Sequence, residues 1–274
     1  MLSKFEKSYG LGYRISDEYL HFARLRLKDD DWNKQEVINE INMENDVREY
    51  KNLDEPLRFF ITATISFFSS GDDGVIELIY KFLRPRIKCP SWSAYEVIKQ
   101  ANEVVHSETY AGIIDFLIDD PQLKEEVFSG LGMYSFVLEK LEWCRSFLSK
   151  KSPLIEIVFC LMITEQLFFS SSFCTIFWFK IIRGIFRGIG MSNELISRDE
   201  GEHYRNGLYI YKVLKSEGFI IAPDRIINII CQATDIEKKI ASKITPTVEG
   251  MNKNLMCQYI EYMADKIMSD IGEK

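Results

Sequence analysis

The sequence predicts an all-α protein, and three observations support that prediction. Apolar residues recur with helical spacing in long segments, whereas no segment alternates apolar and polar residues as a strand does. The 15 glycines and seven prolines fall between these periodic segments. Two segments also carry the motif E-x-x-H, at Glu103–His106 and Glu200–His203. On a helix this spacing brings a carboxylate and an imidazole onto one face.

Proline, glycine and capping residues set the expected helix boundaries. The expected helices cover approximately residues 56–68, 91–118, 124–148 (as a shorter pair), 153–183, 192–216, 224–243 and 253–271. Ser91 can cap the second of these, and either Ser192 or Asn193 can cap the helix that carries the second E-x-x-H. The turn before that helix is marked by Gly184, Gly188 and Gly190.

Two regions leave the helix assignment open. Residues 69–74 are small and polar and look like a loop, yet apolar periodicity resumes at Val75, so one long helix through them is the alternative. The first thirty residues are polar and irregular. We therefore expect an N-terminal arm over residues 1–30 and a single helical domain over residues 31–274.

Composition narrows the class of protein. The net charge of −7 provides no broad basic surface, which argues against nucleic-acid binding. Six scattered cysteines without a C-x-x-C motif, and an N-terminus without an apolar signal core, indicate reduced thiols in a cytoplasmic protein. The apolar stretch 154–186 contains no uncharged run of the ~18–20 residues that a membrane span needs. We therefore expect a buried core helix, in which Glu165 is anomalous.

Carboxylates and imidazoles recur on four of the central helices. The candidate ligands are Asp72, Glu103, His106, Glu165, Glu200 and His203. A lone glutamate is usually exposed or salt-bridged, but these residues fit a four-helix bundle in which two E-x-x-H helices and two further carboxylates hold two metal ions. Ionised carboxylates in a core need such compensation. The donor set suits iron or manganese better than structural zinc.

Tyr110 lies four residues after His106 and shares its helical face. A buried core tyrosine with a satisfied hydroxyl is the alternative interpretation. Phe169 and Phe173 follow Glu165 by four and eight residues and would line the same region with apolar rings, although ordinary core packing explains such a stripe equally well.

Longer stretches of sequence surround these residues. They are V-H-S-E-x-Y at 105–110, E-x-x-F-F-S-x-S-F at 165–173 with I-F-W at 176–178, S-N-E-L-I-S-R-D-E-G-x-H at 192–203, and G-M-N-x-x-L-M-x-Q-Y-I-E at 250–261. From about Trp32 to its last residue, the chain resembles the small, radical-bearing subunit of class I ribonucleotide reductase.

The resemblance implies a ferritin-like bundle that holds two iron ions, with manganese possible. One ion would bind mainly Asp72, Glu103 and His106, and the other Glu165, Glu200 and His203, with Glu103 and Glu200 bridging. Tyr110 matches the tyrosine that becomes a stable radical, and Phe169, Phe173 and Ile196 match its apolar pocket. Trp32 and Asp199 match relay residues, with His106 next to the metal. The resemblance also implies a homodimer or a mixed small-subunit dimer, and a large subunit without which nucleotide reduction does not occur.

Several positions depart from the family pattern. The segment Asn33–Asn45 is longer than usual, and Asp73, Gln166 and Glu202 replace smaller or apolar residues. The family's C-terminal tail does not follow Lys274, which indicates either a shortened chain or a paralogue that cannot act alone. Two alternatives therefore accompany the main hypothesis. One is a catalytically impaired small subunit with a structural or regulatory role, and the other is a different dinuclear enzyme such as an iron oxidase.

Overall fold

The computed structural model confirms the all-α prediction and describes residues 2–10, 12–32, 43–129, 136–149 and 151–273. The helices in these ranges are α1 (Glu18–Asp29), α3 (Met43–Lys51), α4 (Glu55–Leu78), α5 (Pro90–Leu117), α6 (Pro121–Ser129), α7 (Phe136–Phe147), α8 (Leu154–Ile163), α9 (Ser170–Ile181), α10 (Arg187–Ser216), α11 (Pro223–Ile244) and α12 (Lys253–Asp270). π-Helical turns continue α4 over Ile79–Leu83 and join α8 to α9 over Thr164–Phe168. Among the described residues, extended pairing is limited to an isolated bridge between Val248 and Met251.

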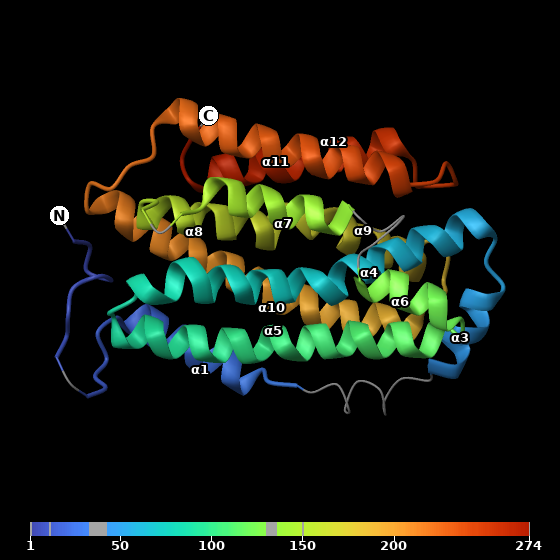
Figure 1. Ribbon diagram of the computed structural model, residues 1–274, viewed down its shortest axis with the longest axis horizontal. Helices are drawn as coiled ribbons and strands as arrows, with labels where there is room; N and C mark the ends of the chain where they lie inside the picture. The colour runs from blue at the N-terminus through green and yellow to red at the C-terminus, as the bar shows by residue number, and fades with distance from the viewer. Residues whose placement is uncertain (1, 11, 33–42, 130–135, 150, 274) are drawn as a thin grey trace.

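The centre of the molecule is a bundle of α4, α5, α10 and the continuous rod formed by α8 and α9 (Figure 1). The helices α11 and α12 pack against each other along one side of this bundle, and α1 lies along α5 on the opposite side. The apolar stripes of the central helices meet in one contiguous core. This arrangement brings α5, α10 and the α8–α9 rod together around the polar residues described below.

The helix α4 runs without a break through residues 69–74, so the single-helix alternative is correct. Its two glycines serve close packing rather than a turn. A Cβ atom on Gly74 would lie 2.1 Å from Leu141 Cδ2, and one on Gly71 would lie 3.2 Å from the ring of Phe169. Small residues here let neighbouring helices approach α4.

The apolar rod over Leu154–Ile181 is long and apolar enough to cross a membrane by composition alone. However, 94% of its most apolar window is buried inside the protein, as expected for a core helix. The π-helical turn Thr164–Phe168 interrupts its regular hydrogen bonding near the middle. Such single turns add a residue to the helix and occur often at functional sites. Glu165 lies in this turn.

The start of α10 corrects the sequence prediction. The helix begins at Arg187, so Ser192 and Asn193 are buried inside it and cannot be caps. Instead, two carboxylates of α3 accept hydrogen bonds from its N-terminal backbone: Asp46 from Ile189 N at 2.8 Å and Glu49 from Phe186 N at 2.7 Å.

The glycines near α10 differ in role. Gly184 has a φ of +68° and lies in the turn after α9, as predicted. In contrast, Gly188 and Gly190 lie within α10. A Cβ atom on Gly190 would lie 2.4 Å from Lys180 Cδ, so this glycine permits close approach of α9 and α10.

The N-terminal segment is irregular only in its first part: residues 2–10 and 12–17 have no regular secondary structure, whereas a helix follows them. Residues 18–29 form α1, whose side chains Leu20, Ala23 and Leu27 are buried. Asp17 caps it by accepting a hydrogen bond from Leu20 N at 3.0 Å. Ser91 does not cap α5. It lies inside that helix, and its hydroxyl accepts hydrogen bonds from the backbone that precedes α1. The segment is therefore packed onto the helical domain, and a domain boundary at residue 30 stays a prediction.

Candidate metal centre

Five of the six predicted metal ligands converge in the core. They are Glu103 and His106 on α5, Glu165 in the π-helical turn, and Glu200 and His203 on α10. All five are buried. Ligand atoms of Glu103, Glu165, Glu200 and His203 all lie within 4.8 Å of one another, and His106 Nδ1 lies 3.0 Å from Glu200 Oε1. The sixth, Asp72, belongs to α4, but its side chain lies outside the described residues.

The two E-x-x-H motifs face each other. Within the motifs, His106 Nδ1 lies 3.6 Å from Glu103 Oε2, and His203 Nδ1 lies 3.2 Å from Glu200 Oε2. Between them, His203 Nδ1 lies 3.1 Å from Glu103 Oε1. Both imidazoles therefore present Nδ1 to the same group of carboxylates. Glu165 completes that group, with its Oε2 atom 3.6 Å from His203 Nδ1.

Several atoms that line this centre are buried without a hydrogen-bond partner. They are both carboxylate oxygens of Glu103, Glu165 Oε2, Glu200 Oε1 and His106 Nδ1. Unsatisfied buried polar atoms are rare and need an explanation. A carboxylate-rich set with imidazole nitrogens provides the donors that iron and manganese accept. The centre therefore fits a metal pair.

The electrostatics of the centre show the same need for positive charge. Burial opposes a charge on each imidazole, but the carboxylates around them outweigh it and hold the pKa of His106 and His203 well above the ordinary value. Burial, together with the facing carboxylates of Glu103 and Glu165, raises the pKa of Glu200 to about 8. Three crowded carboxylates in the core therefore do not all remain ionised without added cations.

Sequence reasoning missed Lys99, which lies at this centre. Lys99 is buried, and its ammonium group donates a hydrogen bond to Glu165 Oε1 and lies 3.8 Å from Glu103 Oε1. A signal was present in the sequence, because Lys99 precedes Glu103 by four residues and so shares its face of α5. Burial opposes its charge, but Glu165 and Glu103 outweigh burial and raise its pKa well above the ordinary value.

A chain of hydrogen bonds links His106 to Trp32 through Asp199. His106 Nε2 lies 3.3 Å from Asp199 Oδ2, and Trp32 Nε1 donates to the same oxygen at 2.7 Å. The rings of Trp32 and His106 stack with centroids 5.9 Å apart. Trp32 thus reaches Asp199 despite the long segment that follows it. Asn102 and Arg198 also donate to Asp199, and these contacts fix the orientation of its carboxylate.

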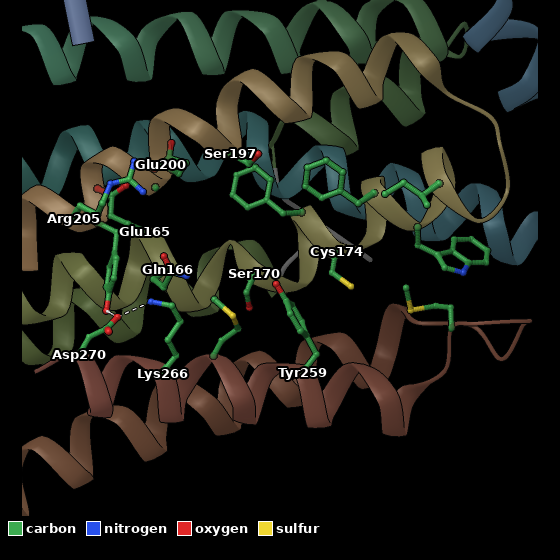
Figure 2. Close-up of a pocket in the computed structure, with 18 of the residues that line it drawn as sticks. Glu165, Gln166, Ser170, Cys174, Ser197, Glu200, Arg205, Tyr259, Lys266 and Asp270 are labelled. Carbon is green, nitrogen blue, oxygen red and sulfur yellow. Dashed lines mark hydrogen bonds and ion pairs between the residues drawn. The ribbon is translucent and has the colours of Figure 1, made fainter. Parts of the chain in front are cut away.

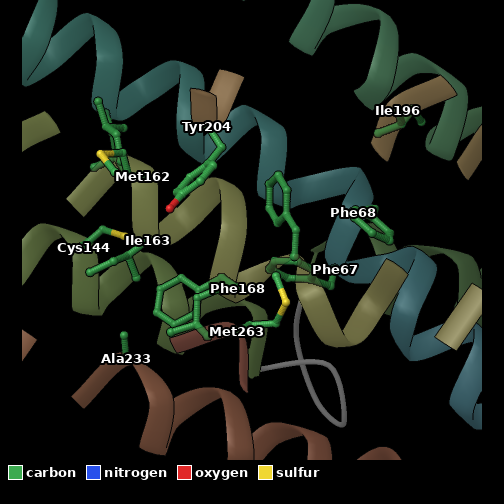
Figure 3. Close-up of a cluster of buried hydrophobic side chains, with 14 of the residues drawn as sticks. Phe67, Phe68, Cys144, Met162, Ile163, Phe168, Ile196, Tyr204, Ala233 and Met263 are labelled. Carbon is green, nitrogen blue, oxygen red and sulfur yellow. The ribbon is translucent and has the colours of Figure 1, made fainter. Parts of the chain in front are cut away.

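Tyr110 is fully buried in an aromatic cluster. Its ring stacks on Phe68 with centroids 4.5 Å apart, and its hydroxyl lies 3.5 Å from Asn193 Oδ1. Phe68 in turn contacts both predicted pocket residues, with ring centroids 5.8 Å from Phe169 and 4.8 Å from Phe173. The predicted Ile196 is buried in the same core, which Figure 3 shows together with Phe67 and Phe68. The sequence did not single out Phe68.

A cavity of about 790 Å³ leads to the centre from the side of α9, α10 and α12. Figure 2 shows Glu165 and Glu200 at one end of it, with Gln166, Ser170 and Tyr259 along its length. A metal site needs such an entry path. Glu202, in contrast, does not add a charge to the centre, because its carboxylate is 2.6 Å from Arg205 in an exposed ion pair.

Comparisons with known proteins agree with this geometry. A family model described as "Ribonucleotide reductase, small chain" matches residues 14–274. The ribonucleoside-diphosphate reductase small chain of Trypanosoma brucei brucei is 32% identical over 240 residues, which is 86% of this chain and 69% of the relative.

Solved structures that share the fold include the following two. The ribonucleotide reductase Rnr4 homodimer from Saccharomyces cerevisiae aligns with a TM-score of 0.81 at 20% identity, covering 98% of this chain and 83% of that one. The dimanganese(II)-NrdF of Streptococcus sanguinis aligns with a TM-score of 0.80 at 17% identity, covering 98% and 93%. These similarities confirm the ferritin-like fold.

Proposed function

This chain belongs to the family of ribonucleotide reductase small chains, and we propose that its buried centre holds two iron ions that serve radical formation at Tyr110. The chain is a ribonucleoside-diphosphate reductase small subunit, and the family implies a dinuclear metal site. Glu103, His106, Glu165, Glu200 and His203 would hold the metal together with Asp72. Manganese is the other candidate metal, because a structural neighbour is a dimanganese protein.

When bound, the iron pair supplies oxidising power from dioxygen for the one-electron oxidation of Tyr110. The protein's own residues orient the ligands for this task. Asp199 accepts a hydrogen bond from His106 Nε2–H. In the neutral imidazole, the lone pair of Nδ1 then faces the carboxylates and could bind a metal ion. The contact with Asp199 sets both the tautomer and the ring orientation of His106.

The surroundings of Tyr110 support a long-lived radical. Oxidation of the phenol removes one electron and the hydroxyl proton, and the remaining radical reacts readily with water and reductants. The stacked Phe68 ring and full burial of Tyr110 exclude both from its ring. Asn193 Oδ1 accepts a hydrogen bond from the hydroxyl and holds the group in place.

For transfer of the oxidising equivalent we propose the path from the metal centre through His106 and Asp199 to Trp32. Its support is the continuous contact between these groups, with 3.3 Å between His106 and Asp199 and 2.7 Å between Asp199 and Trp32. Family membership implies a dimer and a large-subunit partner. We propose that the reaction takes place in the cytoplasm, with either a second copy of this chain or a different small subunit completing the dimer.

The observation that carries the proposal is the convergence of three carboxylates and two imidazole Nδ1 atoms, several of them without partners, in the core. It is tested by loading the protein anaerobically with ferrous iron, adding oxygen and recording electron spin resonance and optical absorption. We expect about two iron ions per chain and a tyrosyl radical signal that Tyr110→Phe abolishes. Full metal loading without a radical, or a radical that survives in Tyr110→Phe, would contradict the assignment.

Lys99 favours a second candidate function. A lysine ammonium among the ligands competes with metal for the same carboxylates. The chain would then be a small subunit that loads metal incompletely and acts as a structural or regulatory partner in a mixed dimer. Nucleotide reduction by this chain with a large subunit alone, without any other small subunit, would exclude this candidate.

A further inference from the structure

We infer that Lys99 is a built-in cation that makes the two metal positions unequal, weakening the position next to Glu165 and His203. The inference rests on the proposed metal centre and concerns how this chain's own residues tune it. Lys99 belongs to α5 and reaches across to the π-helical turn, where it donates to Glu165 Oε1.

The geometry restricts how Glu165 binds a metal ion. One carboxylate oxygen, Oε1, is occupied by the Lys99 ammonium group, whereas Oε2 has no hydrogen-bond partner and faces His203 Nδ1 at 3.6 Å. Glu165 can therefore offer Oε2 as a single ligand atom, but it cannot chelate a metal ion through both oxygens without breaking the contact with Lys99. Lys99 acts as a positioning residue for this ligand.

The positive charge of Lys99 should affect metal binding more than its hydrogen bond does. The described ligands Glu103, Glu165 and Glu200, together with the predicted ligand Asp72, carry up to four negative charges, which two divalent cations would balance, and the Lys99 ammonium reduces that total to three. The remaining charge balances one divalent cation fully and a second one only in part. Since the ammonium contacts Glu165 and Glu103, its repulsion falls mainly on a cation held by those groups with His203. The position on the His106 side lies beyond this contact and should bind first.

The test is anaerobic titration of the metal-free protein with Mn²⁺. Equilibrium dialysis measures the bound metal, and electron spin resonance distinguishes mononuclear from coupled Mn²⁺. For the unmodified protein we expect one tight and one weaker position. Lys99→Gln keeps a hydrogen-bond donor but removes the charge, and should tighten the weaker position by about tenfold or more, the size of effect typical of groups that contact metal ligands.

The matched control is Lys140→Gln, which removes another buried lysine paired with a glutamate, Glu237. Lys140 contacts Phe168 of the π-helical turn but is not paired with a metal ligand, so this variant should change the ratio of the two affinities far less than Lys99→Gln does. A second readout is thermal stability. Lys99→Gln should unfold at a lower temperature than the unmodified protein without metal and gain more from saturating Mn²⁺. If Lys99 only made a structural hydrogen bond, Lys99→Gln would not increase the difference in unfolding temperature between the metal-free and the Mn²⁺-saturated protein.

The outcomes separate the two claims. Two equal Mn²⁺ affinities in the unmodified protein, or unchanged affinities in Lys99→Gln, would overturn the inference but leave the metal centre intact. The first of these needs no variant, so a failure of Lys99→Gln to fold does not prevent the test. Absence of bound Mn²⁺ in both the unmodified protein and Lys99→Gln would overturn the metal centre itself.

Discussion

Two buried lysine–glutamate clusters contact the α8–α9 rod from different sides, and they compensate charge differently. Lys140 of α7 lies 2.7 Å from Glu237 of α11 and donates to the carbonyl oxygen of Phe168 at 2.7 Å. The Ser171 hydroxyl also donates to Glu237. In the other cluster, the single ammonium of Lys99 faces Glu165 and Glu103, with Glu200 beside them.

The two clusters show how a self-contained ion pair differs from a cluster that could accept added cations. The Lys140–Glu237 pair has one charge of each sign and extra polar contacts, so its charges balance: Glu237 Oε2 makes no hydrogen bond by strict geometry but lies 2.7 Å from the Lys140 ammonium group. The Lys99 cluster has more carboxylates than ammonium groups and leaves several of their atoms without partners. In the metal-free protein this imbalance is offset by protons on His106 and His203, whose pKa values lie well above the ordinary value, and a bound metal pair would take the place of those protons. Burial alone does not separate the two clusters, whereas their charge balance does.

The largest expected effect comes from breaking the complete pair. Lys140→Met leaves Glu237 buried without its cation and should lower the free energy of unfolding by about 3–5 kcal/mol. The double variant Lys140→Met/Glu237→Leu should recover most of that loss, because it removes both charges. Urea denaturation of the metal-free proteins measures both values. A loss below about 1 kcal/mol in the single variant would show that the pair is not needed for stability.

A ligand substitution in the incomplete cluster should act in the opposite way. Glu200→Gln removes one carboxylate from a crowded group, so the metal-free protein should be at least as stable as the unmodified one. Metal binding should weaken by on the order of 100-fold, or about 2.7 kcal/mol, through loss of an anionic ligand. Equilibrium dialysis and thermal unfolding test the two halves separately. A large loss of stability without metal would make this cluster structural like the first.

The smallest predicted change in stability concerns Asp46, a buried carboxylate that is stabilised by backbone N–H groups and not by a cation. Asp46 is buried, and its partners at the start of α10 are backbone N–H groups. Burial outweighs these bonds and raises its pKa from 3.8 to about 6. A folded-state pKa above the unfolded value contributes stability at low pH that is lost as pH rises through about 6.

An asparagine at position 46 cannot ionise, so the Asp46→Asn variant should not lose stability in this way as the pH rises. Relative to the unmodified protein, the variant should gain about 2 kcal/mol of unfolding free energy between pH 4.5 and pH 7.5. Urea denaturation at the two pH values measures the change. An equal difference between the two proteins at both pH values would show that Asp46 does not titrate on folding in this range.

Much of the centre could be anticipated because its information is local. The spacing of Glu103 and His106, and of Glu200 and His203, fixes their common faces as soon as the segments are helical. Glu165 was identifiable because an acidic residue in an apolar helix needs a partner. The fold class followed from the same periodicity.

What sequence reasoning missed depends on contacts between distant segments. Lys99 donates to a glutamate 66 residues away, and its spacing from Glu103 places it on the ligand face of the helix without revealing that distant partner. Gly74, Gly188 and Gly190 suggested loops or turns, whereas Gly74 and Gly190 are small because a side chain of another helix lies against them. The helix α1 has a buried stripe because α5 and α10 lie beside it.

The π-helical turn Thr164–Phe168 has a consequence for how this protein can change. Each residue of an α-helix advances the chain by about 100° around its axis, so one inserted residue rotates everything downstream by that amount. The direction in which Glu165 points from the helix axis therefore differs, relative to Phe169 and Phe173, from the direction that a regular α-helix would impose. A one-residue deletion in this turn would make the rod a regular α-helix throughout. The side chains on one half of the rod would then rotate about its axis relative to those on the other half.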